Sequence, residues 1–230
     1  MNKLRLFFVL LVFLFTRAAN AQSSGPLHWP TRNYITWLQQ GVVGQGQILF
    51  IGDSIFESFW WNQIPTNGHF VLNSGHGGAG IDDAIDNANK IVPVARPHLT
   101  FVLIGINDCQ MPTPTTDYVG WGSKYKTLLQ AAKSTDGKVV AVTILPIEDG
   151  KSLSSNFDKN CWFNLNQQVI AISNALGVPW VNANDWFGDP NASPAYWSMK
   201  TGLSADGVHP YGPGMTILYD MLNSAVSIYW

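Results

Sequence analysis

Short apolar segments alternate five times with segments of helical spacing, and this alternation constrains the fold of the chain more than any other feature. The apolar segments are predicted to be strands, and they cover Gln47–Gly52, His69–Asn73, Leu99–Ile104, Lys138–Leu145 and Val178–Val181. The third of them is continuously apolar, as expected for a strand that is covered on both faces. Strands that alternate with helices form a parallel sheet between two helical layers. We therefore predict an α/β fold with three α/β/α layers and a five-stranded parallel sheet.

Helical segments follow or precede these strands, and single glycine and proline residues mark where elements end. The predicted helices run from about Ser54 to Asn62, Ile81 to Ile91, Asp117 to Ser134, Cys161 to Leu176 and Gly212 to Ile228. Gly137 and Gly177 close two of the helices, and Pro146 ends the fourth strand. With no repeat or linker to divide it, 22–230 is predicted to be one domain, in which 22–46 is a polar and aromatic lead-in.

The first 21 residues have the order of a secretory signal peptide. Lys3 and Arg5 precede an apolar run over 6–15, and Ala19-Asn20-Ala21 has the small residues of a cleavage site. The run is too short to span a bilayer comfortably, although an uncleaved N-terminal anchor remains the alternative. We expect cleavage before Gln22, a secreted or periplasmic protein, and no integral membrane segment in the mature chain.

The charge of the mature chain bears on its partners. Loss of residues 1–21 would remove three of the 13 basic residues, which leaves 10 against 15 acidic ones and a net charge of about −5. A nucleic-acid partner would require a basic face, and the sequence has no run of lysine or arginine. We therefore predict that the protein does not bind nucleic acid.

The chain has two cysteines, Cys109 and Cys161. In an oxidising compartment such a pair predicts one disulfide, and the alternative is two buried, unlinked thiols. The cysteines lack the spacing of metal ligands and the histidines are scattered, so we predict neither a metal nor a cofactor.

Polar motifs follow the first three predicted strands. In open parallel sheets, ligands bind beyond the carboxyl ends of the strands. Ser54 follows the first strand and opens a helix, where its hydroxyl could act as a nucleophile; by itself it could equally be a helix N-cap. Gly78 ends a glycine-rich segment after the second strand and could present a bare N–H to an oxyanion, although a tight turn explains it equally well. Asn107, after the third strand, is either a turn residue or an amide donor to an oxyanion.

A fourth motif, Asp206-Gly-Val-His209-Pro210, precedes the last helix. His209 could accept a proton from Ser54 and return it to a leaving group, while Asp206 could fix the tautomer of the imidazole. Alone, the motif could be an exposed turn. Taken together, the four motifs supply each part of an acyl-transfer site, and this combination favours the catalytic interpretation.

At these four motifs the chain resembles the SGNH hydrolases, also called GDSL-like lipases and esterases. The matching blocks are Gly52-Asp53-Ser54, Asn73–Gly78, Gly105-Ile106-Asn107-Asp108 and Asp206–His209. The resemblance spans roughly Ile48 to Pro210, with Ile55 where the family name has leucine and Ala79-Gly80 where a polar residue is frequent. It implies a flavodoxin-like sheet and a Ser54–His209–Asp206 triad. It also implies an oxyanion hole from the N–H groups of Ser54 and Gly78 and the side chain of Asn107.

The substrate is indicated by aromatic residues. The stretch after Ser54 is similar to the tryptophan-bearing first block of carbohydrate acetylesterases in the family, and it contains Glu57, Phe59, Trp60 and Trp61. Trp121, Trp162, Trp186 and Trp197 could also stack on sugar rings, although a place in the core is the alternative for each. His76 is either a turn residue or a substrate contact.

We expect a secreted serine esterase that removes short acyl groups, acetyl above all, from a saccharide or another small ester. One alternative is a lysophospholipase, lipase or thioesterase of the same family. Another is an inactive carbohydrate-binding protein that has kept the fold.

Overall fold

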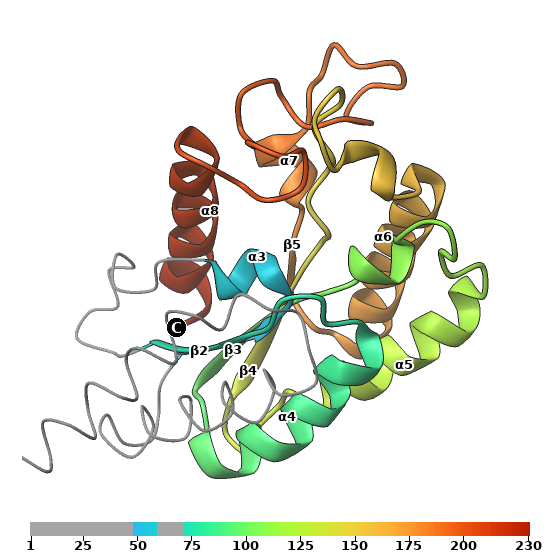
Figure 1. Ribbon diagram of the computed structural model, residues 1–230. Helices are drawn as coiled ribbons and strands as arrows, with labels where there is room; N and C mark the ends of the chain where they lie inside the picture. The colour runs from blue at the N-terminus through green and yellow to red at the C-terminus, as the bar shows by residue number, and fades with distance from the viewer. Residues whose placement is uncertain (1–47, 59–70) are drawn as a thin grey trace, which may run out of the picture.

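Five parallel strands form a single sheet at the centre of the protein (Figure 1). The computed structural model describes residues 48–58 and 71–230. The strands lie in the order β2-β1-β3-β4-β5, and their bounds are β1 Ile48–Gly52, β2 Val71–Gly75, β3 Leu99–Leu103, β4 Lys138–Val142 and β5 Trp180–Val181. This is the flavodoxin-like order, and it confirms the predicted three-layer α/β/α fold.

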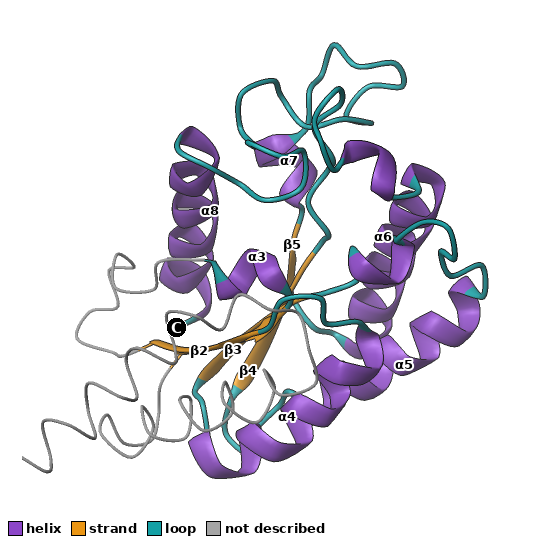
Figure 2. Cartoon of the chain, in the orientation of Figure 1, coloured by secondary structure: helices purple, strands orange, loops and turns teal. Residues whose placement is uncertain are grey.

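Helices cover both faces of the sheet (Figure 2). Their bounds are α3 Ser54–Glu57, α4 Ile81–Ala95, α5 Tyr118–Ala131, α6 Lys159–Leu176, α7 Ala183–Phe187 and α8 Pro213–Tyr229. On one face α5 packs between α4 and α6, and α3 and α8 lie on the other. Every residue of β1, β2 and β3 is buried, because both faces of these strands are covered.

The register of the central strands brings the predicted motifs to one edge. Gly52, the last residue of β1, lies beside Gly75 of β2 and Leu103 of β3. The loops that follow these three strands therefore leave the sheet at the same level. Ser54, Gly78 and Asn107 lie just beyond that edge, as the position of their motifs in the sequence predicted.

Several element boundaries differ from the prediction. The fourth strand ends at Val142, three residues early, because the buried side chain of Asn166 accepts from the Ile144 N–H at 2.7 Å and donates to its carbonyl at 3.0 Å. The fifth strand begins at Trp180, two residues later than predicted, and after it Asn182 caps the unpredicted helix α7 and accepts from the N–H of Asn184. α3 ends at Glu57 with Ser58 as its C-cap, and the rest of its predicted range, 59–62, lies outside the described residues.

α4 extends four residues beyond its predicted end at Ile91. Its buried face continues through Val92 and Ala95, and it ends where Arg96 adopts a left-handed conformation and its N–H donates to the Val92 carbonyl. Over 48–58 and 71–230, none of the helices combines the length and the apolar character needed to cross a membrane. The predicted signal peptide and lead-in lie outside the described residues.

Candidate active site

Asp53 and Ser54 form the junction between β1 and α3. The carboxylate of Asp53 caps the helix, since its Oδ1 accepts from the Ile55 N–H at 2.9 Å. Ser54 is therefore the first residue of α3, and its own N–H has no acceptor within the helix. Its side chain is partly exposed, whereas Asp53 is fully buried beneath it.

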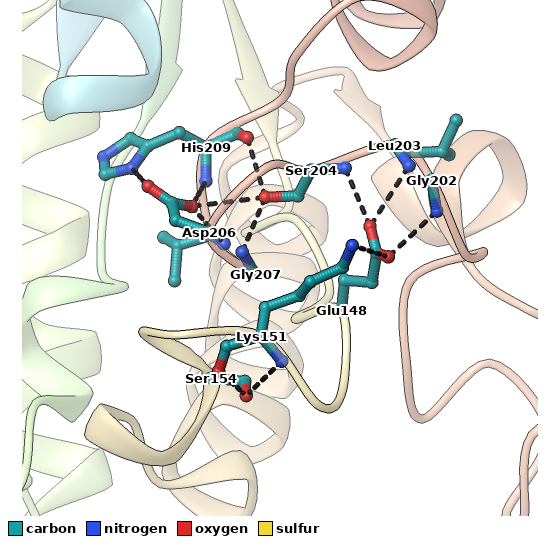
Figure 3. Close-up of polar contacts among 10 residues, drawn as sticks. Glu148, Lys151, Ser154, Gly202, Leu203, Ser204, Asp206, Gly207 and His209 are labelled. Carbon is teal, nitrogen blue, oxygen red and sulfur yellow. Dashed lines mark hydrogen bonds and ion pairs between the residues drawn. The ribbon is translucent and has the colours of Figure 1, made fainter.

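The structure brings Ser54, His209 and Asp206 together although the first two are 155 residues apart in the chain. The hydroxyl of Ser54 lies 2.7 Å from Nε2 of His209, and Nδ1 of His209 lies 2.7 Å from Oδ2 of Asp206 (Figure 3 shows the second contact). Because a carboxylate only accepts, Nδ1 carries the proton and Nε2 is left to accept from the hydroxyl of Ser54. This is the geometry in which a serine can lose its proton to a histidine.

Asp206 is held as a carboxylate by its own turn. Its Oδ1 accepts from the N–H groups of Val208 and His209, both at 2.9 Å. Burial opposes ionisation, but these bonds and the His209 ring outweigh it and lower the pKa of Asp206 to about 2. The group that orients the imidazole therefore stays charged throughout the physiological range.

Gly207 allows this turn to lie against the loop that follows β4. Its φ is +105°, a conformation that side chains rarely adopt. A Cβ at this position would lie 3.0 Å from the carbonyl oxygen of Glu148 and 3.0 Å from Cβ of Lys151. Only glycine fits between Asp206 and His209 without moving one of the two loops.

The two other predicted oxyanion donors lie in adjoining turns. Gly78 has a φ of +77°, and a Cβ built on it would meet nothing within 4 Å, so this side of the turn faces open space. Asn107 begins a 3-10 turn and donates from Nδ2 to the carbonyl of Ala79 at 3.0 Å. An amide nitrogen has two hydrogens, and this bond uses one of them. The turn that carries Gly78 thus also orients the side chain of Asn107.

Two acidic residues within these motifs, Asp53 and Asp108, have raised pKa values. Burial is the main cause for both, and it raises the pKa of Asp53 to about 7. Asp108 follows Asn107 and accepts from the N–H of Ile81 at 3.2 Å, which ties the 3-10 turn to the start of α4. The sequence motifs give neither carboxylate a predicted function, although the position of Asp53 directly before a helix is the usual signal of a cap.

The predicted disulfide between Cys109 and Cys161 is present. It joins the turn that begins at Asn107 to the first turn of α6. The N–H of Asp158 also donates to the carbonyl of Cys109 at 2.9 Å. Both contacts fasten the Asn107 turn to the same neighbouring segment.

The structure excludes two of the candidate sugar contacts, and the others stay predictions. Trp121 and Trp162 are buried core residues with 4% and 1% exposure, so neither can stack on a substrate. Trp186 and Trp197 are partly buried, and Trp60 and Trp61 lie outside the described residues. His76 is buried in the turn, where its N–H donates to the Gly52 carbonyl at 2.9 Å and its carbonyl accepts from Ala79; its contact with substrate stays a prediction.

The core tryptophans belong to the packing of the sheet and its helices. Trp121 stacks on Tyr125 within α5, and the indole N–H of Trp162 donates to the Ile144 carbonyl at 3.0 Å. Large aromatic side chains fill the interior more often than they line a site. Within the residues that the structure describes, no three His, Cys, Asp or Glu side chains are grouped so that they could hold a metal ion.

Solved structures with the same fold include several hydrolases. A protein from Streptococcus pneumonia whose name refers to platelet activating factor has 18% identity and a TM-score of 0.73, with 98% of this chain and 100% of that chain covered. A GDSL-like lipase from Bacteroides thetaiotaomicron has 20% identity and a TM-score of 0.71, with 86% and 98% covered. An acetyl xylan esterase has 19% identity and a TM-score of 0.66, with 78% and 99% covered.

Sequence comparison assigns the family. A comparison with curated proteins gives no match. The profile of the GDSL-like lipase/acylhydrolase family, in contrast, matches residues 50–217, which is most of the chain and includes both Ser54 and His209. The chain therefore belongs to the GDSL-like lipase/acylhydrolase family and is a hydrolase of ester bonds.

Proposed function

We propose that this protein is an exported serine esterase that removes short acyl groups, acetyl above all, from a saccharide. The observation that carries the mechanism is the unbroken hydrogen-bond chain from the hydroxyl of Ser54 through His209 to Asp206, with 2.7 Å at each step. The family places the reaction among ester hydrolyses.

In the first half of the reaction, the oxygen of Ser54 attacks the ester carbonyl while its proton passes to Nε2 of His209. The negative charge that develops on the carbonyl oxygen is stabilised by the N–H groups of Ser54 and Gly78 and by Nδ2 of Asn107. One such donor typically contributes about 10²- to 10³-fold to kcat. His209 then gives its proton to the departing alcohol, and an acyl group remains on Ser54.

In the second half, water attacks the acyl-enzyme. His209 takes the proton of the water and returns it to Ser54, which releases the carboxylic acid. Asp206 holds the imidazole in the tautomer that both halves need and stabilises the imidazolium that forms in each. Its depressed pKa means that it performs this role as an anion over the whole physiological pH range.

The substrate assignment rests on the first block and on one structural neighbour. Trp60 and Trp61 follow Ser54 as in carbohydrate acetylesterases of the family, and we propose them, with His76, as contacts of the sugar. One protein with the same fold is named an acetyl xylan esterase. Export is proposed from residues 1–21, whose order of charged, apolar and small residues is that of a signal peptide.

The test compares acyl chain lengths on the mature chain, residues 22–230. Acetyl p-nitrophenyl ester should have a higher kcat/KM than the octanoyl ester, and acetylated xylan should release acetate. Preference for octanoyl would favour the lysophospholipase or thioesterase alternative. The intact hydrogen-bond chain argues against an inactive binding protein, which would also fail to react with a fluorophosphonate at Ser54.

Ser54→Ala tests the mechanism, and Ser58→Ala is its control. Ser58 follows the last residue of the same helix as its C-cap, is exposed, and takes no part in the hydrogen-bond chain. Ser54→Ala should lose activity by at least about 10³-fold, whereas Ser58→Ala should match the wild type. Full activity in Ser54→Ala would disprove the serine mechanism.

A further inference from the structure

Glu148 is a buried carboxylate near the candidate site that the proposed mechanism does not use. It follows β4 in the loop that leads to α6, and it has 2% exposure. Its two oxygens accept three backbone N–H groups of a distant segment: Gly202 at 2.9 Å, Leu203 at 3.1 Å and Ser204 at 2.8 Å (Figure 3). The backbone N–H groups of this segment therefore donate to a side-chain carboxylate, as they would donate to the carbonyls of a neighbouring strand in a sheet.

The charge of Glu148 is compensated locally. Burial favours the neutral form, but the N–H groups of Gly202 and Ser204 and the ammonium of Lys151 outweigh it and lower the pKa of Glu148. Lys151 Nζ lies 3.2 Å from Oε1. Charge-assisted bonds of this kind are stronger than neutral ones, so the contacts of Glu148 hold the Gly202–Ser204 segment tightly.

Ser204 connects this carboxylate to the candidate site. While its N–H donates to Glu148, its hydroxyl lies 2.8 Å from the backbone carbonyl of His209 and 3.2 Å from Oδ1 of Asp206. The same oxygen accepts from the Gly207 N–H at 2.8 Å. A continuous path of hydrogen bonds therefore runs from Glu148 through Ser204 to both residues that activate Ser54.

The backbone of the Glu148 loop holds the other side of the same turn. The Glu148 N–H donates to the carbonyl of Gly207 at 2.8 Å, and the Leu153 N–H donates to the carbonyl of Asp206 at 2.8 Å. These contacts matter because residues 188–212, all of them described, contain no helix and no strand. The position of His209 is therefore set by side-chain and loop contacts and not by a regular element.

We propose that Glu148 is a positioning residue, which fixes the Gly202–Ser204 segment so that Asp206 and His209 meet Ser54 in a reactive geometry. The inference rests on the proposed serine mechanism and extends it to a residue that touches no reacting atom. A small displacement of a base relative to its nucleophile lowers the rate of the chemical step strongly. Loss of Glu148 should therefore lower kcat and leave KM nearly unchanged.

The first experiment compares Glu148→Gln with Asp149→Asn. Glutamine keeps the size of the side chain, but its NH2 would face a backbone N–H, so at least one of the three bonds is lost. Asp149 is the adjacent, exposed carboxylate and binds Lys159 and Ser198 instead. With p-nitrophenyl acetate, Glu148→Gln should have at least tenfold lower kcat with KM within twofold, and Asp149→Asn should match the wild type. An unchanged kcat in Glu148→Gln would overturn the proposal.

A second measurement separates positioning from general damage to the fold. If Glu148 acts through His209, adding Glu148→Gln to His209→Ala should lower the residual rate no further. An equal loss in both backgrounds would overturn the proposal. If Glu148→Gln does not fold, Ser204→Ala tests the same connection. This variant keeps the backbone N–H that donates to Glu148 and removes only the hydroxyl that contacts Asp206 and His209. Unchanged kcat in Ser204→Ala would then refute the role.

The Ser54→Ala variant tests the proposed function separately from the role of Glu148. If Ser54→Ala remains active, the serine mechanism fails, whatever Glu148 does. If a fluorophosphonate labels Ser54 equally fast in wild type and Glu148→Gln, only the positioning role fails.

Discussion

Replacing Asp53 with asparagine should change how the stability of the protein depends on pH. Asp53 is completely buried, its Oδ1 caps α3, and its Oδ2 has no hydrogen-bond partner in the part of the chain that the structure describes. Burial is the largest cause that raises the pKa of this carboxyl from 3.8 to about 7; the Ile55 N–H and His209 act in the opposite direction. Asparagine keeps an oxygen for the Ile55 N–H and cannot titrate.

The sign and size of the effect follow from the pKa. Between pH 4 and 7 the folded protein holds this proton and the unfolded chain has largely lost it, so the free energy of unfolding falls as pH rises. The contribution is complete below about pH 4 and lost above about pH 7. A shift of about three units corresponds to about 4 kcal/mol in total, and to about 1.4 kcal/mol for each pH unit within this window.

Urea unfolding of the wild type and Asp53→Asn at several pH values between 5 and 8 measures this difference. From pH 5 to 7 the wild type should lose about 2–3 kcal/mol relative to Asp53→Asn. Asp149→Asn is the control. Burial opposes the ionisation of Asp149, but Lys159 and Ser198 outweigh it and lower the pKa of this carboxyl, so the exposed group titrates below the window. Parallel curves for the wild type and Asp53→Asn would refute the argument that burial holds the proton on Asp53.

Three other substitutions probe the loops around Ser54. Gly78→Ala should cost about 1–2 kcal/mol of unfolding free energy from its positive φ alone. Gly207→Ala should cost more and should also lower kcat, because its Cβ would meet Glu148 and Lys151 as well. Urea midpoints and kcat compare the two variants, and equal costs would contradict the steric argument. The double substitution Cys109→Ser/Cys161→Ser opens a link between residues 52 positions apart, and it should cost about 4 kcal/mol in the chain-entropy model and lower kcat. Unchanged kcat would show that the disulfide does not brace the Asn107 turn, and alkylation of Cys109 in unreduced protein would show that the disulfide does not form.

The sheet and the place of the motifs could be predicted because they depend on local patterns. Each buried strand is an apolar run, and parallel strands bring their carboxyl ends to one edge, so Ser54, Gly78 and Asn107 could be assigned to that edge from sequence. Boundaries were less predictable where a side chain replaces a backbone partner. The side chain of Asn166 forms hydrogen bonds with both the N–H and the carbonyl of Ile144, and the fourth strand therefore ends early although the sequence there remains apolar.

The contacts that hold the candidate site could not be predicted. Glu148 binds N–H groups that lie 54 to 56 residues further along the chain, and backbone donors leave no signature in a sequence. The sequence does not show whether Trp121 and Trp162 stack on a sugar or fill the core, because tryptophan serves in both roles. Only their burial in the folded protein distinguishes a core residue from a sugar contact. α7 is a helix of five residues, too short for its periodicity to be recognised.

The separation of 155 residues between Ser54 and His209 has a consequence for the nascent chain. During synthesis Ser54 and β1 to β4 are complete long before His209 has emerged, so under the proposed mechanism a growing chain carries the hydroxyl without the base that would activate it. Under the proposed mechanism, hydrolysis therefore begins only when the segment that carries His209 has folded against Ser54.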